Sequence, residues 1–202
     1  MSLLKSKNPV FVVFEGLDGS GKSTIARLVA EKLNAKFITT PDEEIRKYRP
    51  AIIKSFSRNQ EAAHLFYMST VFNASRIADE YLAEGFSVVL DRYYLSTQAY
   101  ASFRGSKLDL TDLEQMLRPA DLTVYLDVLL NIRKERLSAR GTSPEDRETL
   151  TAKSDRQLRE EHFGRICLPV TGKTQLLECS DQTPEEIALE VVEKIKAIGY
   201  FR

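Results

Sequence analysis

Short apolar runs alternate along this chain with longer segments in which apolar residues recur at helical spacing. The runs are rich in Val, Ile, Leu, Phe and Tyr and do not alternate strictly with polar residues, which is typical of strands buried on both faces of a parallel sheet. They cover Val10–Glu15, Lys36–Thr39, Ser87–Asp91, Leu122–Asp127 and Gln175–Cys179. Strands that alternate with helices predict an α/β fold, here a five-stranded parallel sheet with helices on both faces.

Capping residues mark where several helices begin and end. Thr111 with Glu114 and Thr183 with Glu186 have the spacing of a capping box, in which each side chain binds a backbone amide of the other residue. Gly85 has the conformational freedom that commonly ends a helix. The expected helices with legible ends are Ile25–Leu33, Gln60–Glu84, a short one from Thr111 that stops before Pro119, and a last one from Thr183 to about Ile198.

A glycine-rich turn joins the first expected strand to the first expected helix. Between Gly16 and Ser23 it has the pattern G-x-x-x-x-G-K-S, which binds phosphate when it stands between a strand and a helix. Its glycines let successive backbone amides point inward, and the following helix adds the positive end of its dipole. Lys22 would reach the β- and γ-phosphates and Ser23 would hold Mg²⁺, whereas the alternative is a chance match in an ordinary turn. The expected contacts to a nucleoside triphosphate come from Gly16, Asp18, Gly19, Ser20, Gly21, Lys22, Ser23 and Thr24.

A second polar cluster follows the third expected strand. Asp91 ends the apolar run, which beside a phosphate loop is the usual position for organising Mg²⁺, directly or through water. Arg92 offers a planar fork to a second phosphate. The small polar residues that come next, with one aromatic, are expected on a loop leading into a helix: Ser96, Thr97, Gln98 and Tyr100. The alternative is a strand-end salt bridge, with Ser96 as a helix N-cap.

Composition narrows the classes of function. The chain has 202 residues, enough for a substantial core, and we expect a single domain over residues 1–202. Its formal net charge is zero, so it has no overall electrostatic footprint for nucleic acid or an anionic membrane. Two cysteines are too few for a disulfide scaffold, and we find neither a signal peptide nor an apolar run of the roughly 20 residues that a membrane span needs. A cytoplasmic protein is the expectation.

Two of these stretches together resemble the thymidylate kinase family of P-loop nucleoside monophosphate kinases. They are Phe14–Thr24, which contains the phosphate loop, and Leu90–Tyr100, and the likeness extends over nearly the whole chain, including Arg118–Thr123. The resemblance implies a P-loop α/β domain that transfers the γ-phosphoryl group of ATP to dTMP, with Mg²⁺. It also implies a homodimer that pairs through long helices, for which the Gln60–Glu84 helix is the candidate.

The resemblance implies roles for several residues around the acceptor. Asp18 would lie near the acceptor phosphate and sugar, and Arg92 would clamp the monophosphate. Phe66 would stack on the pyrimidine, unless it is simply a core aromatic of the long helix. Thr97 and Tyr100 would line the base and sugar pocket, with Tyr100 near the 2′ position. Lys22, Asp18 and Arg92 are therefore expected among the catalytic residues.

An arginine-rich segment follows the fourth expected strand. Its arginines are Arg133, Arg136 and Arg140, on one helix face, and Arg147 after the helix break at Gly141–Pro144. In the family, a phosphate loop without arginine goes with arginines supplied by a lid, and the loop here contains none. We expect a lid at about residues 140–148, and our hypothesis is that Arg140 and Arg147 contact the transferring phosphoryl group. The alternative for each arginine, more so for Arg133 and Arg136, is a solvated position paired with a nearby glutamate.

The acceptor side departs from the family's pattern. Bacterial members usually carry Thr-Arg-Glu-Pro-Gly after the second strand, where Thr39–Glu43 here reads Thr-Thr-Pro-Asp-Glu. Arg46 and Arg49 are candidate substitutes for the missing arginine. Thr70 stands where many members place an arginine against the base, and the segment before the fourth strand is short.

These departures leave three alternatives to a dTMP kinase. The first is a related kinase for UMP, CMP or another pyrimidine nucleotide. The second is a deoxynucleoside kinase, which would need a general base such as Glu15 near the attacking hydroxyl. The third is a nucleotide-dependent switch, against which the sequence has no Asn-Lys-x-Asp guanine signature.

Overall fold

The five expected strands form one parallel sheet. The computed structural model describes residues 5–197, apart from the side chains of residues 144 and 145. The strands lie in the order β2-β3-β1-β4-β5, and every neighbouring pair is parallel. Their bounds are β1 Phe11–Gly16, β2 Lys36–Thr39, β3 Val88–Asp91, β4 Leu122–Asp127 and β5 Lys173–Glu178. Because β1 lies between β3 and β4, the strand order reverses there, and a ligand crevice is expected at its carboxyl end.

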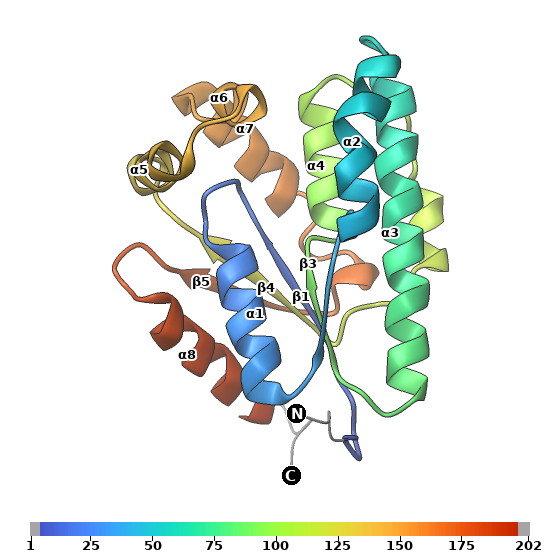
Figure 1. Cartoon of the computed structure of the whole chain (residues 1–202), viewed down its shortest axis with the longest axis vertical. Coiled ribbons are helices and arrows are strands. Elements are labelled where there is room, and N and C mark those ends of the chain that lie inside the picture. Colours follow the sequence, from blue (N-terminus) through green and yellow to red (C-terminus); the bar gives the residue numbers. More distant parts are fainter. Residues whose placement is uncertain (1–4, 198–202) are drawn as a thin grey trace.

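Helices cover both faces of this sheet (Figure 1). On one face α1 (Lys22–Leu33) and α8 (Pro184–Ala197) bury their apolar side chains against β1 and β4. The other face is covered by α3 (Gln60–Ala83), α4 (Tyr94–Phe103) and α7 (Ala152–Phe163). The expected α/β architecture is therefore confirmed.

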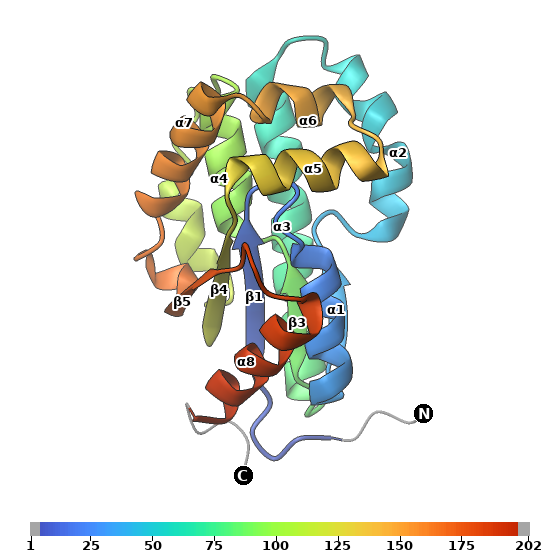
Figure 2. The ribbon, with the colours of Figure 1, turned by 90° about the vertical axis from the view of Figure 1, so that its left-hand side faces the viewer.

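The remaining helical segments lie around the ends of the strands. They are α2 (Glu43–Ser55), α5 (Leu130–Arg140), α6 (Pro144–Thr149) and two 3₁₀ segments at Thr111–Met116 and Pro169–Thr171. Figure 2 shows α5 and α6 crossing above the carboxyl end of β1. The arginine-rich segment thus overhangs the turn that follows β1.

The sequence predicts the bounds of four strands to within one residue, including the partly exposed β2. All residues of β1 and β3 are buried, so their apolar runs coincide with the strands to within one residue. The expected fifth strand, Gln175–Cys179, is wrong by one to two residues, because β5 runs from Lys173 to Glu178. That strand is a largely exposed edge, and its bounds follow its pairing with β4 rather than its apolar residues.

Two expectations about helix starts differ from the structure. Ser96, Thr97, Gln98 and Tyr100 lie within α4 rather than on a loop, because only Arg92 and Tyr93 separate β3 from α4, which begins at Tyr94. The capping box at Thr111 is also wrong. The Thr111 backbone amide and hydroxyl bind the Asp109 carboxylate at 3.0 and 2.7 Å, while Glu114 is buried and accepts the Val170 amide at 2.9 Å.

Other expectations are confirmed. Thr183 and Glu186 form a capping box at the start of α8, with amide contacts of 2.8 and 3.3 Å. The expected end of that helix, Ile198, lies outside the described residues. Gly85, with φ of 88°, follows α3 as predicted. Within residues 5–197 no helix combines the length and the apolar character needed to cross a membrane.

Candidate active site

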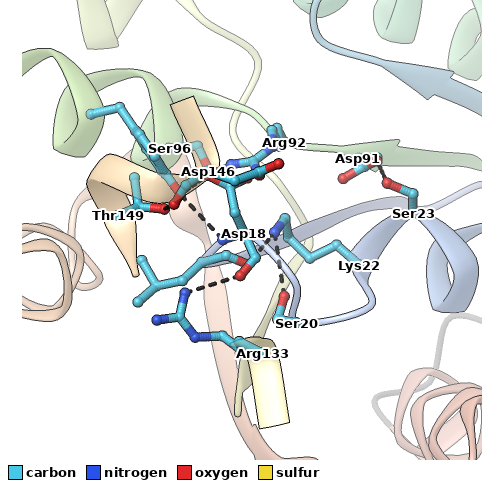
Figure 3. Close-up of polar contacts among 12 residues, drawn as sticks. Asp18, Ser20, Lys22, Ser23, Asp91, Arg92, Ser96, Arg133, Asp146 and Thr149 are labelled. Carbon is cyan, nitrogen blue, oxygen red and sulfur yellow. Dashed lines mark hydrogen bonds and ion pairs between the residues drawn. The ribbon is translucent and has the colours of Figure 1, made fainter. Parts of the chain in front are cut away.

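The phosphate loop closes over the carboxyl end of β1 (Figure 3). Gly19 and Gly21 have φ values of 81° and 90°, in the left-handed region that glycine adopts without strain. At Gly16 an added Cβ would lie 2.6 Å from the carbonyl oxygen of Leu126, so a side chain there would force β1 and β4 apart. Because α1 begins at Lys22, the unpaired amides of its first turn border the loop.

Lys22 is buried inside the loop to which it belongs. Its Nζ donates to the carbonyl oxygen of Leu17 at 2.7 Å and to Ser20 Oγ at 3.3 Å. Burial, together with the charge of Arg92, lowers the pKa of Lys22 to about 7. A phosphate in the loop would restore the full charge of this ammonium group. The lysine is therefore a poorly solvated cation poised for an anion.

Ser23 and Asp91 meet between α1 and the end of β3. The Ser23 hydroxyl donates to Asp91 Oδ2, while Asp91 Oδ1 is buried and has no partner among the described residues. An orphaned carboxylate oxygen beside a hydroxyl supplies the hard oxygen ligands that Mg²⁺ prefers. The described residues contain no group of three or more His, Cys, Asp or Glu side chains suited to a metal. A bound Mg²⁺ would therefore take its remaining ligands from phosphate and water.

Asp18, Arg92 and Tyr100 form a network at the tip of the loop. Arg92 Nη2 donates to Asp18 Oδ1, and the Tyr100 hydroxyl donates to Asp18 Oδ2 at 2.7 Å. The same hydroxyl accepts the backbone N–H of Asp18 at 3.2 Å. Burial alone would raise the pKa of Asp18, but the charges of Arg92 and Lys22 hold it well below its usual range. The side chains of Asp18 and Arg92 are 24% and 25% exposed, so a ligand can reach both.

Glu15 holds the start of α4 beside this network. Its Oε1 accepts the backbone N–H groups of Tyr93 at 2.9 Å and Ser96 at 3.2 Å, and its Oε2 accepts the Ser96 hydroxyl. Ser96 Oγ in turn accepts Arg92 Nη1 at 3.1 Å. Burial raises the pKa of Glu15, although these hydrogen bonds favour its charged form. A carboxylate that caps a helix in this way gives no support to the alternative in which Glu15 acts as a general base.

Two arginines of α5 touch the back of the loop. Arg133 is fully buried, and its Nη1 donates to the carbonyl oxygen of Asp18 at 3.0 Å (Figure 3). Arg136 Nη1 donates to the carbonyl oxygen of Ser20 at 3.3 Å. The solvated position that the sequence left open for these two arginines is wrong for Arg133, whereas Arg136 is half-buried.

Arg140 and Arg147 lie apart from the loop in this structure. Arg140 Nη2 donates to Asp146 Oδ1 at 3.1 Å, and its side chain is 61% exposed. Arg147 is exposed on α6. That helix is tied to α4 by Arg104, which donates to Glu148 Oε1 from Nε and Nη2 at 2.8 and 2.6 Å. A contact of Arg140 or Arg147 with the transferring group stays a prediction.

Phe66 and Thr97 lie on helices that flank the network. Phe66 is half-buried on α3 and packs edge-to-face with Phe56 and Tyr67, at centroid distances of 6.3 and 5.3 Å. Thr97 Oγ1 donates to the carbonyl oxygen of Tyr93 at 3.1 Å. Their contacts with a base and sugar also stay predictions.

Two residues on the acceptor side, where the sequence departs from the family's pattern, form hydrogen bonds with residues close to them in the chain. Arg46 Nη2 folds back onto Thr39 Oγ1 at 2.9 Å and the carbonyl oxygen of Pro41 at 3.2 Å. Thr70 is buried, and its hydroxyl donates to the carbonyl oxygen of Tyr67 at 2.7 Å. Arg46 thus braces the turn after β2, and Thr70 is bound to its own helix.

The sequence gives almost no indication of an ion-pair cluster behind the loop. Asp155 of α7 pairs with Arg133 and also accepts Arg159 Nε at 3.0 Å, while Arg159 pairs with Asp127 at the end of β4. One signal was available, since Arg133 lies four residues before the buried Leu137 and so shares its face of α5. The partners of Arg133 could not be predicted from the sequence, because they lie in the phosphate loop and on α7.

A family model described as thymidylate kinase matches residues 14–183. The chain belongs to the thymidylate kinase family. Members of this family are ATP-dependent phosphotransferases. The matched segment includes the phosphate loop, the Asp91–Arg92 pair and the arginine-bearing segment, so the family assignment covers all the parts of the site described above.

Individual relatives agree with this family assignment. A protein named probable thymidylate kinase from Methanococcus maripaludis (strain C7) is 38% identical over 133 residues, covering 64% of this chain and 66% of the relative. The thymidylate kinase of Leptospira interrogans (serovar copenhageni) is 33% identical over 162 residues, covering 73% of this chain and 78% of the relative.

Solved structures share the fold. Thymidylate kinase from Candida albicans superposes with a TM-score of 0.74 at 23% identity, over 96% of this chain and 93% of the other. Thymidylate kinase from Ehrlichia chaffeensis gives a TM-score of 0.67 at 21% identity, over 93% and 99%. At these identities the likeness concerns the architecture, which is that of a P-loop α/β domain.

Proposed function

We propose that this protein transfers the γ-phosphoryl group of ATP to dTMP, giving ADP and dTDP. The observation that carries the proposal is the Asp18–Arg92 ion pair, which joins the phosphate loop to the end of β3. A cradle for one phosphate chain and a guanidinium for a second phosphate thereby lie at one edge of the sheet. Membership of the thymidylate kinase family supports ATP as the donor and dTMP as the acceptor.

This reaction needs alignment and charge neutralisation rather than a general base. The attacking atom is a phosphate oxygen of the monophosphate, which is already anionic. Lys22 offsets charge on the β- and γ-phosphates, and Arg92 holds the acceptor phosphate in line with them. Asp18 stays ionised because of its low pKa, and it orients Arg92 and Tyr100 through its two carboxylate oxygens.

Ser23 and Asp91 are the residues that would hold Mg²⁺. The ion, when bound, offsets negative charge on the transferring group. The buried Asp91 Oδ1, which has no hydrogen-bond partner within the described part of the chain, and the Ser23 hydroxyl support this assignment.

Replacing Asp91 with Asn should raise the Mg²⁺ concentration needed for half-maximal rate by about 10- to 100-fold. The reason is that the ion would lose a carboxylate that binds it directly or through a water molecule. A coupled assay of ADP release over a MgCl₂ series measures this. Asp112→Asn, an exposed carboxylate in the 3₁₀ segment, is the matched control and should keep the wild-type dependence. An unchanged Mg²⁺ requirement in the Asp91 variant would contradict the assignment.

Arg140 and Arg147 would reach the transferring group when the lid at residues 140–148 closes over it. The side chain of Arg140 is 61% exposed, and its contact with Asp146 lies at the surface, which supports a role in which it is redirected to the phosphate. Alanine at either position should then lower kcat far more than it raises KM, because the contact would be made mainly in the transition state.

A panel of acceptors tests the proposal as a whole. ADP release should be stimulated most by dTMP, compared with dUMP, UMP, CMP and thymidine. A preference for UMP or CMP would support the related pyrimidine nucleotide kinase. That kinase is the second candidate, because Arg46 and Thr70, which stand at or near positions where the family's pattern has arginine, bind groups of their own chain instead. Phosphorylation of thymidine would indicate a deoxynucleoside kinase, and acceptor-independent turnover would indicate a switch.

The homodimer and the cytoplasmic location belong to the same proposal. The large apolar residues of α3 that could form the dimer face are Phe72, Ile77 and Tyr81. Two of them, Phe72 and Tyr81, pack against the core of their own chain. The homodimer therefore rests on the family resemblance.

A further inference from the structure

One guanidinium reaches the phosphate loop from inside the protein. Arg133 lies near the start of α5, and its side chain has no exposed surface. Its Nη1 donates to the carbonyl oxygen of Asp18 at 3.0 Å, and its Nη2 pairs with Asp155 of α7. The backbone of α5 also lies against the loop, since a Cβ added at Gly19 would lie 3.0 Å from the carbonyl oxygen of Arg133.

This contact sets the direction of one peptide unit. The carbonyl of Asp18 and the N–H of Gly19 belong to the same trans peptide, so they point in opposite directions. While Arg133 holds the carbonyl toward α5, the Gly19 N–H must point away from α5. Glycine imposes little steric barrier to rotation of this unit, so the loop sequence alone does not choose between the two orientations.

The burial of the charged Arg133 side chain carries a desolvation penalty that packing of α5 alone does not require. A buried cation loses its hydration, and Arg133 Nε is buried without a partner among the described residues. An apolar side chain of similar size would fill the same space without that cost. An apolar residue could supply neither the ion pair with Asp155 nor the donor to the Asp18 carbonyl, and Asp155 has a second cationic partner in Arg159. The donor to the loop is therefore the contact that only Arg133 provides for the Asp18 carbonyl among the described residues.

We propose that Arg133 is a positioning residue that turns the Gly19 amide toward the phosphates of the bound nucleotide. When the guanidinium is removed, the peptide can turn over and present a carbonyl oxygen to the phosphate, which repels it. The inference rests on the proposed function in that the loop must bind ATP. It goes further by assigning the orientation of one loop amide to a residue of α5.

The test is a pair of binding titrations with Arg133→Met. Methionine keeps the apolar bulk and removes the donor, while Asp155 keeps its contact with Arg159 at 3.0 Å. The Kd for ATP, measured without monophosphate, should rise about 10- to 100-fold, as expected for losing a hydrogen bond to a charged group. The Kd for dTMP should stay within about twofold of wild type, and Arg133→Lys should recover part of the ATP affinity.

Arg159→Met is the matched control, because it removes a guanidinium from the same cluster without touching the loop. It should leave the ratio of the two Kd values unchanged. Wild-type ATP affinity in Arg133→Met would overturn the inference, and so would equal weakening of ATP and dTMP. Failure of the proposed function is seen separately, as absence of ATP binding or of acceptor-stimulated turnover in the wild type.

Discussion

Replacing Lys22 with Met should lower kcat by about 10³-fold and leave the protein folded. The ammonium group lies inside the loop, 2.7 Å from one backbone carbonyl, where little water can substitute for it. Removing a preorganised charged donor from such a site commonly costs 10²- to 10³-fold in rate, and this one faces the phosphates between which the bond breaks. Steady-state kinetics with saturating ATP and dTMP measure the effect.

The same substitution should raise the melting temperature. The pKa of Lys22 falls from 10.5 to about 7 on folding, because of burial and the charge of Arg92. Between these values the unfolded chain binds more protons than the folded one, so stability rises with pH. Below about pH 7 the folded protein carries the full cost of the buried charge. Methionine removes that cost, and a gain of about 2–4 °C is expected for each kcal/mol recovered in a chain of this size.

Lys32→Met is the control for both measurements, since it makes the same change at an exposed position of the same helix. Its kcat and melting temperature should equal those of the wild type. Two results would contradict the account of Lys22: a variant that retains its kcat, or one that melts well below the wild type.

The parts of the fold that the sequence predicts are those set by local pattern. β1 and β3 are buried at every position, so their apolar residues coincide with the strands. The phosphate loop is predictable for a similar reason, because its backbone conformation needs glycine at particular positions. The meeting of Asp91 with the loop follows from the parallel sheet, which places the carboxyl ends of neighbouring strands together.

The start of α4 shows what local pattern misses. No residue just before Tyr94 caps the helix, so the sequence suggests a loop there. The cap is Glu15, which lies 78 residues before Tyr93 in the sequence and meets it only once β1 and β3 pair. A helix start that depends on a distant carboxylate cannot be read from its own residues.

The arginines of α5 show the same limit in the site. Charge and spacing place Arg133 on an arginine-rich helix face before the expected lid, yet one of its partners is a backbone carbonyl 115 residues away. Side-chain pattern carries no information about which carbonyl a donor will reach. Whether an arginine points to solvent or into the interior was decided here by how α5 packs on Gly19, which is a tertiary contact.

Replacing Arg92 with Met should lower kcat/KM for dTMP by about 10²- to 10³-fold while leaving the Kd for ATP within about threefold. The guanidinium is held by Asp18 and Ser96 and is a quarter exposed, so it presents a rigid, accessible donor to the acceptor phosphate. Arg76→Met, which removes an exposed arginine from α3, is the control and should change neither quantity. Equal loss of dTMP and ATP binding would contradict a role confined to the acceptor side.

The Arg92 variant should also unfold at a higher pH on acid titration. In the wild type, Arg92 and Lys22 hold the pKa of Asp18 well below the 3.8 expected for an unfolded chain. A carboxyl group with a lowered pKa stabilises the fold above about pH 4, and this contribution is lost as the pH falls toward the folded-state value. Without Arg92 the pKa of Asp18 rises, so the contribution shrinks. Circular dichroism from pH 6 to pH 2 measures the shift, and coincident acid transitions for the variant and wild type would show that Asp18 does not depend on Arg92.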